Sequence, residues 1–294
     1  TAATPGSATV YVPEGVDAAV SWLADAPDAT VLAGGTDLMV EVNDGHRRPG
    51  GDVVVVNRIA ELRSWRHDPI DGTLRIGAAV SWTDLAAEPL ATLVPALAQA
   101  ARTVGSPQIR NAGTLGGNLG TCSPAGDGLP VLAALDATVE LASVQGRRTV
   151  PVGEFMVGAK RTAMQPGELI VAVTVPVVEG WQGYAKVGVR NAMVIAVAST
   201  CVVVDRAQRS VAIALGSVGA TVLRCPDAEV HAERAIDWDT CRLDTADLGR
   251  VAALVSNASR PIDDHRSSAA YRRHAVGVLA RRLLARATRV EVAA

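Results

Sequence analysis

The chain has 294 residues, and 49% of them are hydrophobic, which is enough to fill one large core or two ordinary domains. Its 28 basic and 30 acidic residues leave a net charge of -2, which excludes the basic surface of a nucleic-acid-binding protein and a polybasic membrane signal. Aromatic residues make up only 3%, so base-stacking platforms are not expected either.

The cysteines and the apolar stretches give no sign of a metal motif or a membrane span. The four cysteines are too widely spaced for a CxxC motif. The longest apolar stretch, residues 193–204, is well short of the roughly 20 residues that span a bilayer. Residues 1–10 contain neither a basic residue nor the apolar segment of a secretory signal. We therefore expect a cytoplasmic protein.

The first part of the chain predicts short helices and strands. Apolar residues at helical spacing predict a helix over 14–25, and a polar loop is expected at 43–51. Ser81 should cap a further helix, with Asp84 near its third position. Runs of apolar and β-branched residues predict strands over 29–34, 52–57 and 73–78.

A helix is predicted over 90–103, and the glycine-rich stretch 105–128 is expected to be a long loop. After a helix over 130–137, the chain predicts an antiparallel series of strands and then two helices rich in Ala and Arg. Because strands and helices segregate, the pattern favours an α+β fold with its main boundary near residues 178–181. The strands are expected at 137–144, 146–152, 168–177, 181–189, 194–204 and 210–218, and the helices at 247–258 and 267–286.

The first candidate site follows the strand at 29–34. Gly34 and Gly35 have no Cβ, so the backbone there can approach a ligand closely, and Thr36 adds a hydroxyl. The amides that follow open a short helix, whose N-terminus favours anions. The sequence therefore predicts a pyrophosphate cradle, although an ordinary strand-to-helix turn would show the same pattern.

The second candidate site has four glycines among residues 113–120, together with possible hydrogen-bonding side chains on Thr114, Asn118, Thr121 and Asp127. Neither site reads as a Walker A or GxGxxG motif. A mobile surface loop would show the same composition, but two such loops in one domain are uncommon without a function. Two lysine-free glycine loops predict a large phosphate-bearing cofactor held mainly by backbone.

Other clusters are weaker candidates. The five histidines are scattered, so no metal site is expected, and no GxSxG nucleophile motif is present. The acidic pair Asp263–Asp264 precedes a helix, where acids normally act as caps. The arginine pairs 272–273 and 281–282 predict a solvated or partner-facing helical surface. The chemistry must therefore come from a cofactor.

These motifs resemble the FAD-binding subunit of the molybdenum hydroxylases, the family of xanthine dehydrogenase, carbon monoxide dehydrogenase and heteroaromatic hydroxylases. The resemblance implies a two-part FAD-binding domain over 1–178, of the PCMH or vanillyl-alcohol-oxidase-like type. A smaller domain over 179–294, with a three-stranded antiparallel sheet and helices, would follow it. The segments that carry the resemblance are AGGTDL at 33–38, GTLRIGAAVSWTDL at 72–85, IRNAGTLGGNL at 109–119, SPAGD at 123–127, GELIVAVTVP at 167–176, GYAKVGVRNAMVIAVAS at 183–199, LGSVGATVLR at 215–224 and SSAAYRRHAVGVLARRLL at 267–284.

The resemblance also implies roles for individual residues. Asp127 would meet the ribityl or ribose region, and Ile170 and Lys186 would touch the flavin end. Tyr184 would either shield a flavin face or pack within its strand. No residue of this chain would be catalytic in its own right, because the chain relays electrons through FAD. The pyrophosphate would be held by Leu32, Ala33, Gly34, Gly35, Thr36, Asp37 and Leu38, and by a second clamp of Thr114, Gly116, Gly117, Asn118 and Thr121.

The implied reaction is electron relay within a complex. A large subunit would carry the molybdenum cofactor, and a small subunit would carry two [2Fe-2S] clusters, whose eight ligands four scattered cysteines cannot supply. FAD would pass electrons to NAD+, oxygen or another acceptor, in a dimer of heterotrimers. Thr36–Asp37 favours a xanthine, purine or N-heterocycle dehydrogenase over a carbon monoxide dehydrogenase. A stand-alone FAD reductase of cell-wall precursor synthesis and a subunit that holds FAD without turnover are two further hypotheses.

Overall fold

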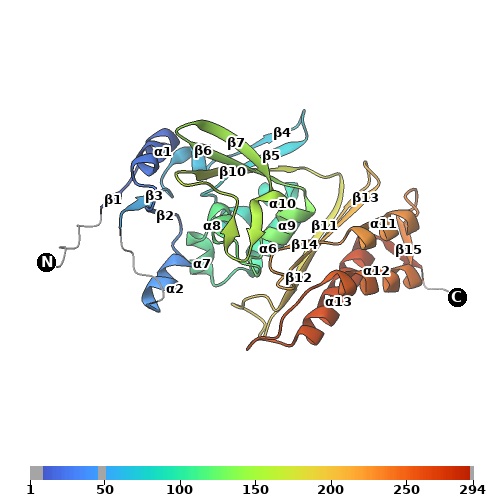
Figure 1. Ribbon diagram of the computed structural model, residues 1–294. Helices are drawn as coiled ribbons and strands as arrows, with labels where there is room; N and C mark the ends of the chain where they lie inside the picture. Colours follow the sequence, from blue (N-terminus) through green and yellow to red (C-terminus); the bar gives the residue numbers. More distant parts are fainter. Residues whose placement is uncertain (1–8, 46–50, 292–294) are drawn as a thin grey trace.

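The computed structural model describes residues 9–45 and 51–291 (Figure 1). The predictions for residues 1–8 and for the centre of the polar loop, 46–50, lie outside the described residues. The predicted α+β class is confirmed, because most helices and strands are segregated along the chain.

A small parallel sheet opens the fold. Its strands stand in the order β1-β3-β2, and the helix predicted near the N-terminus, α1, packs its buried face beside them. The short helix α2 follows β2, as the first glycine motif predicted. These elements are β1 (Val10–Tyr11), α1 (Val16–Asp25), β2 (Thr30–Leu32), α2 (Leu38–Asn43) and β3 (Val53–Val55).

The second sheet has five antiparallel strands in the order β4-β5-β10-β6-β7. Its central strand β10 is almost completely buried, because α1 covers part of it and α8 contacts it as well. The elements of this part are α3 (Ala60–Arg63), β4 (Trp65–Asp68), β5 (Thr73–Gly77), β6 (Thr138–Ser143), β7 (Gly146–Pro151), α10 (Val152–Phe155), β8 (Met156–Gly158), β9 (Arg161–Thr162) and β10 (Leu169–Pro176).

The helices between β5 and β6 correct two predictions. The capping box of Ser81 and Asp84 is confirmed. The helix predicted over 90–103 is two helices, because Pro95 begins a new one. The long loop predicted over 105–128 contains two more, capped by the hydroxyls of Ser106 and Thr114. The six helices are α4 (Trp82–Leu85), α5 (Leu90–Leu93), α6 (Pro95–Thr103), α7 (Pro107–Ala112), α8 (Leu115–Thr121) and α9 (Leu129–Ala134).

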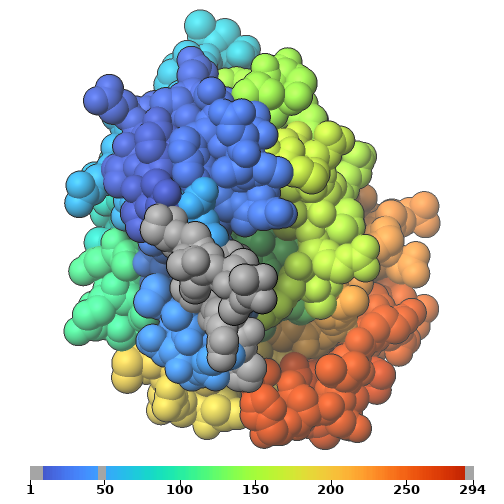
Figure 2. Space-filling model, turned by 60° about the vertical axis from the view of Figure 1, so that its left-hand side comes forward, coloured from blue at the N-terminus to red at the C-terminus, as the bar shows by residue number. Residues whose placement is uncertain are grey.

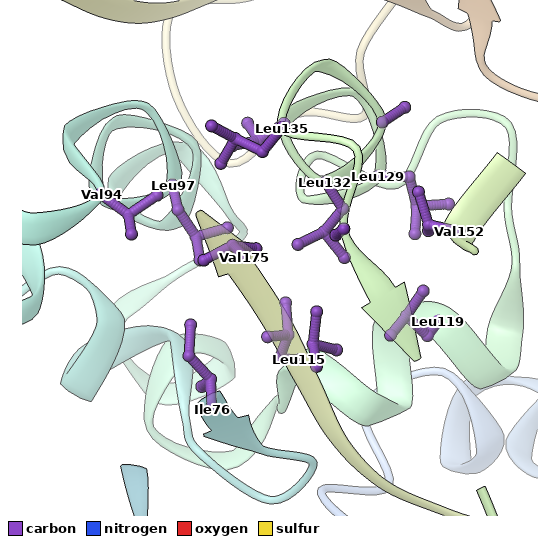
Figure 3. Packing of buried hydrophobic residues seen from close by; sticks show 14 of the residues in the cluster. Ile76, Val94, Leu97, Leu115, Leu119, Leu129, Leu132, Leu135, Val152 and Val175 are labelled. Carbon is purple, nitrogen blue, oxygen red and sulfur yellow. The ribbon is translucent and has the colours of Figure 1, made fainter. Parts of the chain in front are cut away.

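Burial explains why α8 forms despite its glycines. Leu115 and Leu119 are fully buried in the main core, beside Ile76 of β5 and Val175 of β10 (Figure 3). Tertiary packing of one apolar face therefore outweighs the low helix propensity of glycine.

The C-terminal part contains the predicted antiparallel meander, which is followed by the predicted helices. A two-residue fourth strand and the helix α11 were not predicted, and β12 begins only at Ala198 instead of residue 194. The elements are β11 (Gly180–Val187), β12 (Ala198–Asp205), β13 (Ser210–Gly216), β14 (Leu223–Arg224), α11 (Pro226–Ala235), β15 (Arg242–Asp244), α12 (Thr245–Ala258), α13 (Ala269–Ala287) and β16 (Arg289–Glu291).

This C-terminal sheet is buried on both faces (Figure 1). Along β12, Cys201 and Val203 point into the core shared with α6 and α9, whereas Val202 and Val204 point into a second core under α11, α12 and α13. The two parts of the chain therefore share one core, and β11 and its neighbours can reach residues of the N-terminal part.

Arg272 differs from its prediction. It lies on α13 but is buried, and its guanidinium donates to the carbonyl oxygens of Val197 and Ser217 and pairs with Asp264. Arg273, by contrast, is exposed as predicted. The N-cap of α13 is Ser268 and not one of the acidic pair, although Asp263 accepts from the amide of Ala269, the first residue of this helix.

Candidate cofactor-binding site

A cavity of about 750 Å³ lies between the small parallel sheet, the α8 segment and the start of β10. In Figure 2 a hollow opens between the blue N-terminal segment and the yellow-green residues. Of the predicted site residues, Lys186 alone is absent from its lining. The others line it together: Leu32, Ala33, Gly34, Gly35, Thr36, Asp37, Leu38, Thr114, Gly116, Gly117, Asn118, Thr121, Asp127 and Ile170.

The first glycine loop, Ala33–Leu38, presents its backbone to the cavity. Gly35 has a φ of +69°, which favours glycine, and a Cβ on Gly34 would overlap the carbonyl oxygen of Ala112. Within the described part of the chain, the amides of residues 34–38 donate no hydrogen bond. Consecutive unpaired amides of this kind suit an anionic ligand.

The second glycine segment, Gly113–Gly120, is more rigid. The Thr114 hydroxyl accepts from the Gly117 amide at 3.0 Å, so its role is to cap α8. A Cβ on Gly116 would lie 2.6 Å from the Cβ of Ala78, so this glycine is required by packing. A Cβ on Gly117 would meet only the Thr114 hydroxyl, at 3.0 Å, and would otherwise point into free space. Gly117 therefore leaves room that a side chain would fill.

The side chain of Thr121 connects the two glycine segments, and that of Asn118 adds a polar group beside the cavity. The Thr121 hydroxyl donates to Asp37 Oδ2 at 2.9 Å, which ties the second segment to the first loop. Asn118 Oδ1 is buried at the cavity and has no partner among the described residues. Since a buried acceptor without a partner is costly, it suits a ligand hydroxyl or amine.

Asp127 lines the cavity and is held from behind by β11. Tyr184 Oη donates to Asp127 Oδ1 at 2.7 Å, and Lys186 Nζ pairs with Oδ2 at 2.6 Å. Burial raises the pKa of Asp127, while the Lys186 ammonium and the Tyr184 hydroxyl act in the opposite direction. Burial, with the nearby Asp127 charge, raises the pKa of Tyr184 well above its usual range, so its hydroxyl remains a donor.

The sequence missed several lining residues. Glu41 and Lys160 form an ion pair of 2.8 Å at the cavity, between α2 and the turn of β8 and β9. The one feature of the sequence that could have drawn attention to this pair is that Lys160 is one of only two lysines in the chain. Apolar side chains form a second group of missed residues, of which Ile109 had been placed in a loop and Val194 and Ile195 in a strand: Val104, Ile109, Met193, Val194 and Ile195.

Among residues 9–45 and 51–291, no group of three His, Cys, Asp or Glu side chains could hold a metal ion. No helix in the same ranges is both long enough and apolar enough to cross a bilayer. The polar groups of the site are its backbone amides and Asp127, which Tyr184 and Lys186 hold in place.

Comparisons with known proteins agree with this geometry. Residues 6–178 match the FAD binding domain in molybdopterin dehydrogenase, and residues 184–287 match the CO dehydrogenase flavoprotein C-terminal domain. The xanthine dehydrogenase FAD-binding subunit of Escherichia coli O157:H7 is 30% identical over 279 residues, 92% of each chain. The nicotinate dehydrogenase FAD-subunit of Eubacterium barkeri is 39% identical over 180 residues, 59% of each chain.

Solved structures show the same fold. The Cu,Mo-CO dehydrogenase structure contains a chain that is 29% identical, with a TM-score of 0.85, over 97% of this chain and 98% of that one. The chain belongs to the family of FAD-binding medium subunits of the molybdenum hydroxylases, which includes the xanthine and CO dehydrogenases. It is therefore an oxidoreductase subunit with an FAD-binding domain, and the relatives it resembles include medium chains of glyceraldehyde and carbon monoxide dehydrogenases.

Proposed function

We propose that FAD occupies the cavity, with its pyrophosphate between the first glycine loop and α8. The observation that carries this proposal is the run of amides from Gly34 to Leu38 that have no partner among the described residues, in a cavity that Gly117 also lines. The pyrophosphate would accept from these amides, and Asn118 Oδ1 would accept from a cofactor hydroxyl. Leu32, Ala33, Gly116 and Thr121 would complete this part of the site.

The flavin ring would lie toward Asp127 and Ile170. The lining of the cavity includes the apolar side chains that a large planar ring needs, with Ile109, Met193 and Ile195 among them. Bound FAD supplies the capacity to accept and release electrons one or two at a time. The side chains that line the cavity would bind and orient the ring and exclude water from part of it. Lys186 would act on this end through Asp127.

We further propose that the chain relays electrons from [2Fe-2S] clusters of a small subunit to NAD+, oxygen or another acceptor, within a dimer of heterotrimers. An N-heterocycle or purine is the proposed substrate class of the large subunit. The names of relatives support it, since they include nicotinate and xanthine dehydrogenase subunits. A carbon monoxide dehydrogenase medium subunit is the second candidate, supported by the similarity to the solved CO dehydrogenases.

The proposed domain division is 1–178 for FAD binding and 179–294 for the C-terminal domain, which agrees with the family matches at 6–178 and 184–287. The proposed location is the cytoplasm, where thiols stay reduced. The free and buried state of all four cysteines, Cys122, Cys201, Cys225 and Cys241, is compatible with it.

The proposal is tested by purifying the native complex, recording its absorption spectrum, separating its subunits and analysing its metals. We expect flavin on this chain, and molybdenum and iron on two co-purifying chains. Heterocycles and carbon monoxide are then supplied in turn as reductants, followed by NAD+ or oxygen. Bleaching of the flavin by one substrate and its recovery with one acceptor would establish the relay. Flavin that never bleaches would contradict a redox role.

A further inference from the structure

The cluster of Asp127, Tyr184 and Lys186 connects the two parts of the chain behind the cavity. Asp127 precedes α9, whereas Tyr184 and Lys186 stand two residues apart on β11 and so share one face of that strand. Asp127 lines the cavity, but neither Tyr184 nor Lys186 does. Any effect of these two side chains on a bound ligand must therefore pass through their partners.

The Lys186 ammonium has no N–H group left for a ligand. Its three protons match three acceptors: Asp127 Oδ2 at 2.6 Å, the Thr103 carbonyl at 3.0 Å and the Val194 carbonyl at 3.1 Å. The last two carbonyls belong to the cavity wall or adjoin it, since Val104 and Val194 both line the cavity. Lys186 is therefore engaged fully in holding Asp127 and this wall in place.

Tyr184 is fixed at both ends. Its backbone amide donates to Gln99 Oε1 at 2.8 Å, and its hydroxyl donates to Asp127 Oδ1 at 2.7 Å. The side chain is buried in the main core, so the phenol cannot turn away without leaving a cavity. The two oxygens of Asp127 are thus held by two different donors, which leaves the carboxylate a single orientation.

We propose that Tyr184 is a positioning residue, which fixes the orientation and charge distribution of Asp127 and thereby sets the affinity and the midpoint potential of the bound flavin. This inference rests on the proposed occupation of the cavity by FAD. Removal of the hydroxyl would leave Oδ1 without its donor, so the negative charge already on this oxygen would be less well compensated beside the cofactor. Electrons added to the flavin would then be less favoured, so the midpoint potential should become more negative.

The first test compares Tyr184→Phe with the wild-type full chain. FAD affinity is measured by fluorescence titration of the apoprotein, and the midpoint potential of the loaded chain by equilibration with redox dyes. We expect about tenfold weaker FAD binding, because one hydrogen bond to a charged group is lost, and a more negative potential. Tyr271→Phe is the matched control, since Tyr271 is 47% exposed on α13, and both quantities should stay at wild-type values.

The second test is a double-mutant cycle with Asp127→Asn, measured in the same way. If Tyr184 acts through Asp127, Tyr184→Phe should change affinity and potential much less in a chain that already carries Asp127→Asn than in the wild type. Equal effects in both backgrounds would overturn the inference. Weaker binding of Tyr184→Phe at an unchanged potential would also overturn it, since packing alone would then explain the loss. A wild-type chain that binds no FAD would instead refute the proposed function itself.

Discussion

The two glycine-rich segments at the cavity have similar compositions but opposite structural roles. The first loop, Ala33–Leu38, is partly exposed, and its amides from Gly34 onward have no partners among the described residues. The second segment, Gly113–Gly120, contains most of α8, which is capped by Thr114 and anchored by Leu115 in the main core. In the first loop glycine leaves backbone amides at the cavity, although Gly34 also packs against Ala112. In the second segment Gly116 allows the helix to pack against Ala78, just after β5.

The adjacent glycines of α8 show the same contrast within one turn. Gly116 is buried against Ala78, whereas Gly117 leaves space at the cavity. Neighbouring glycines can therefore be needed for different reasons, one for close packing within the fold and the other for leaving room for a ligand. Substitutions at these two positions should separate stability from cofactor binding.

The largest effect is expected from Gly116→Val. The new side chain would collide with Ala78 in a part of the core that cannot yield, so the free energy of unfolding should fall by about 3 kcal/mol. Denaturant unfolding of the apoprotein measures this directly. An unchanged unfolding midpoint would show that α8 can move away from β5, and the contrast with the first loop would be lost.

Gly117→Val should deplete the flavin without unfolding the protein. The side chain would enter the cavity and weaken FAD binding by at least about tenfold, while the free energy of unfolding should change by less than about 1 kcal/mol. Gly249→Val is the matched control, because Gly249 is also helical and a Cβ there meets nothing. Flavin titration and denaturant unfolding are measured on both variants. Full FAD affinity in Gly117→Val would contradict the clamp assignment.

Thr121→Val tests whether the two segments must be tied together. It removes the 2.9 Å hydrogen bond to Asp37, so we expect a loss of about 1 kcal/mol of stability or less and a few-fold weaker FAD binding. Thr92→Val is the control, since it removes a hydrogen bond of 2.7 Å to Glu88 and Thr92 does not line the cavity. Equal FAD affinities of the two variants would show that the tie has no part in binding.

The smallest expected effect is on the pH dependence of stability, through Glu168 in the wall of the cavity. Two hydrogen bonds from Arg148 lower the pKa of Glu168, which lines the cavity. Because the pKa of this carboxyl is lower in the folded than in the unfolded state, its ionised form stabilises the fold. This stabilisation is complete above the unfolded pKa of about 4.3 and is lost as the pH falls through the folded pKa. Wild type should therefore lose more stability than Glu168→Gln between pH 7 and about pH 3. Parallel pH profiles of the two proteins would argue against this pair.

Local signals in the sequence predicted much of the fold. The capping box at Ser81 and the long strands of the C-terminal meander depend on neighbouring residues, and both are confirmed. The two glycine motifs, both covered by the family resemblance, line one cavity. Their assignment as FAD ligands stays a prediction.

The remaining errors come from tertiary contacts that no local pattern contains. The helix α8 forms because Leu115 and Leu119 are buried, although its glycines favour a loop. Arg272 is buried where it donates to two carbonyl oxygens from distant parts of the chain, those of Val197 and Ser217, besides pairing with the nearby Asp264. The full use of the Lys186 protons likewise depends on carbonyls from α6 and from the connection after β11.

The scarcity of lysine makes the cavity chemically addressable. The chain has two lysines, and the side chain of Lys186 is only 7% exposed, whereas that of Lys160 is 63% exposed. An amine-reactive fluorophore should therefore attach at Lys160 in preference to Lys186, beside the entrance of the cavity. Energy transfer between this dye and a bound flavin would then report loading and release in real time, with no engineered cysteine.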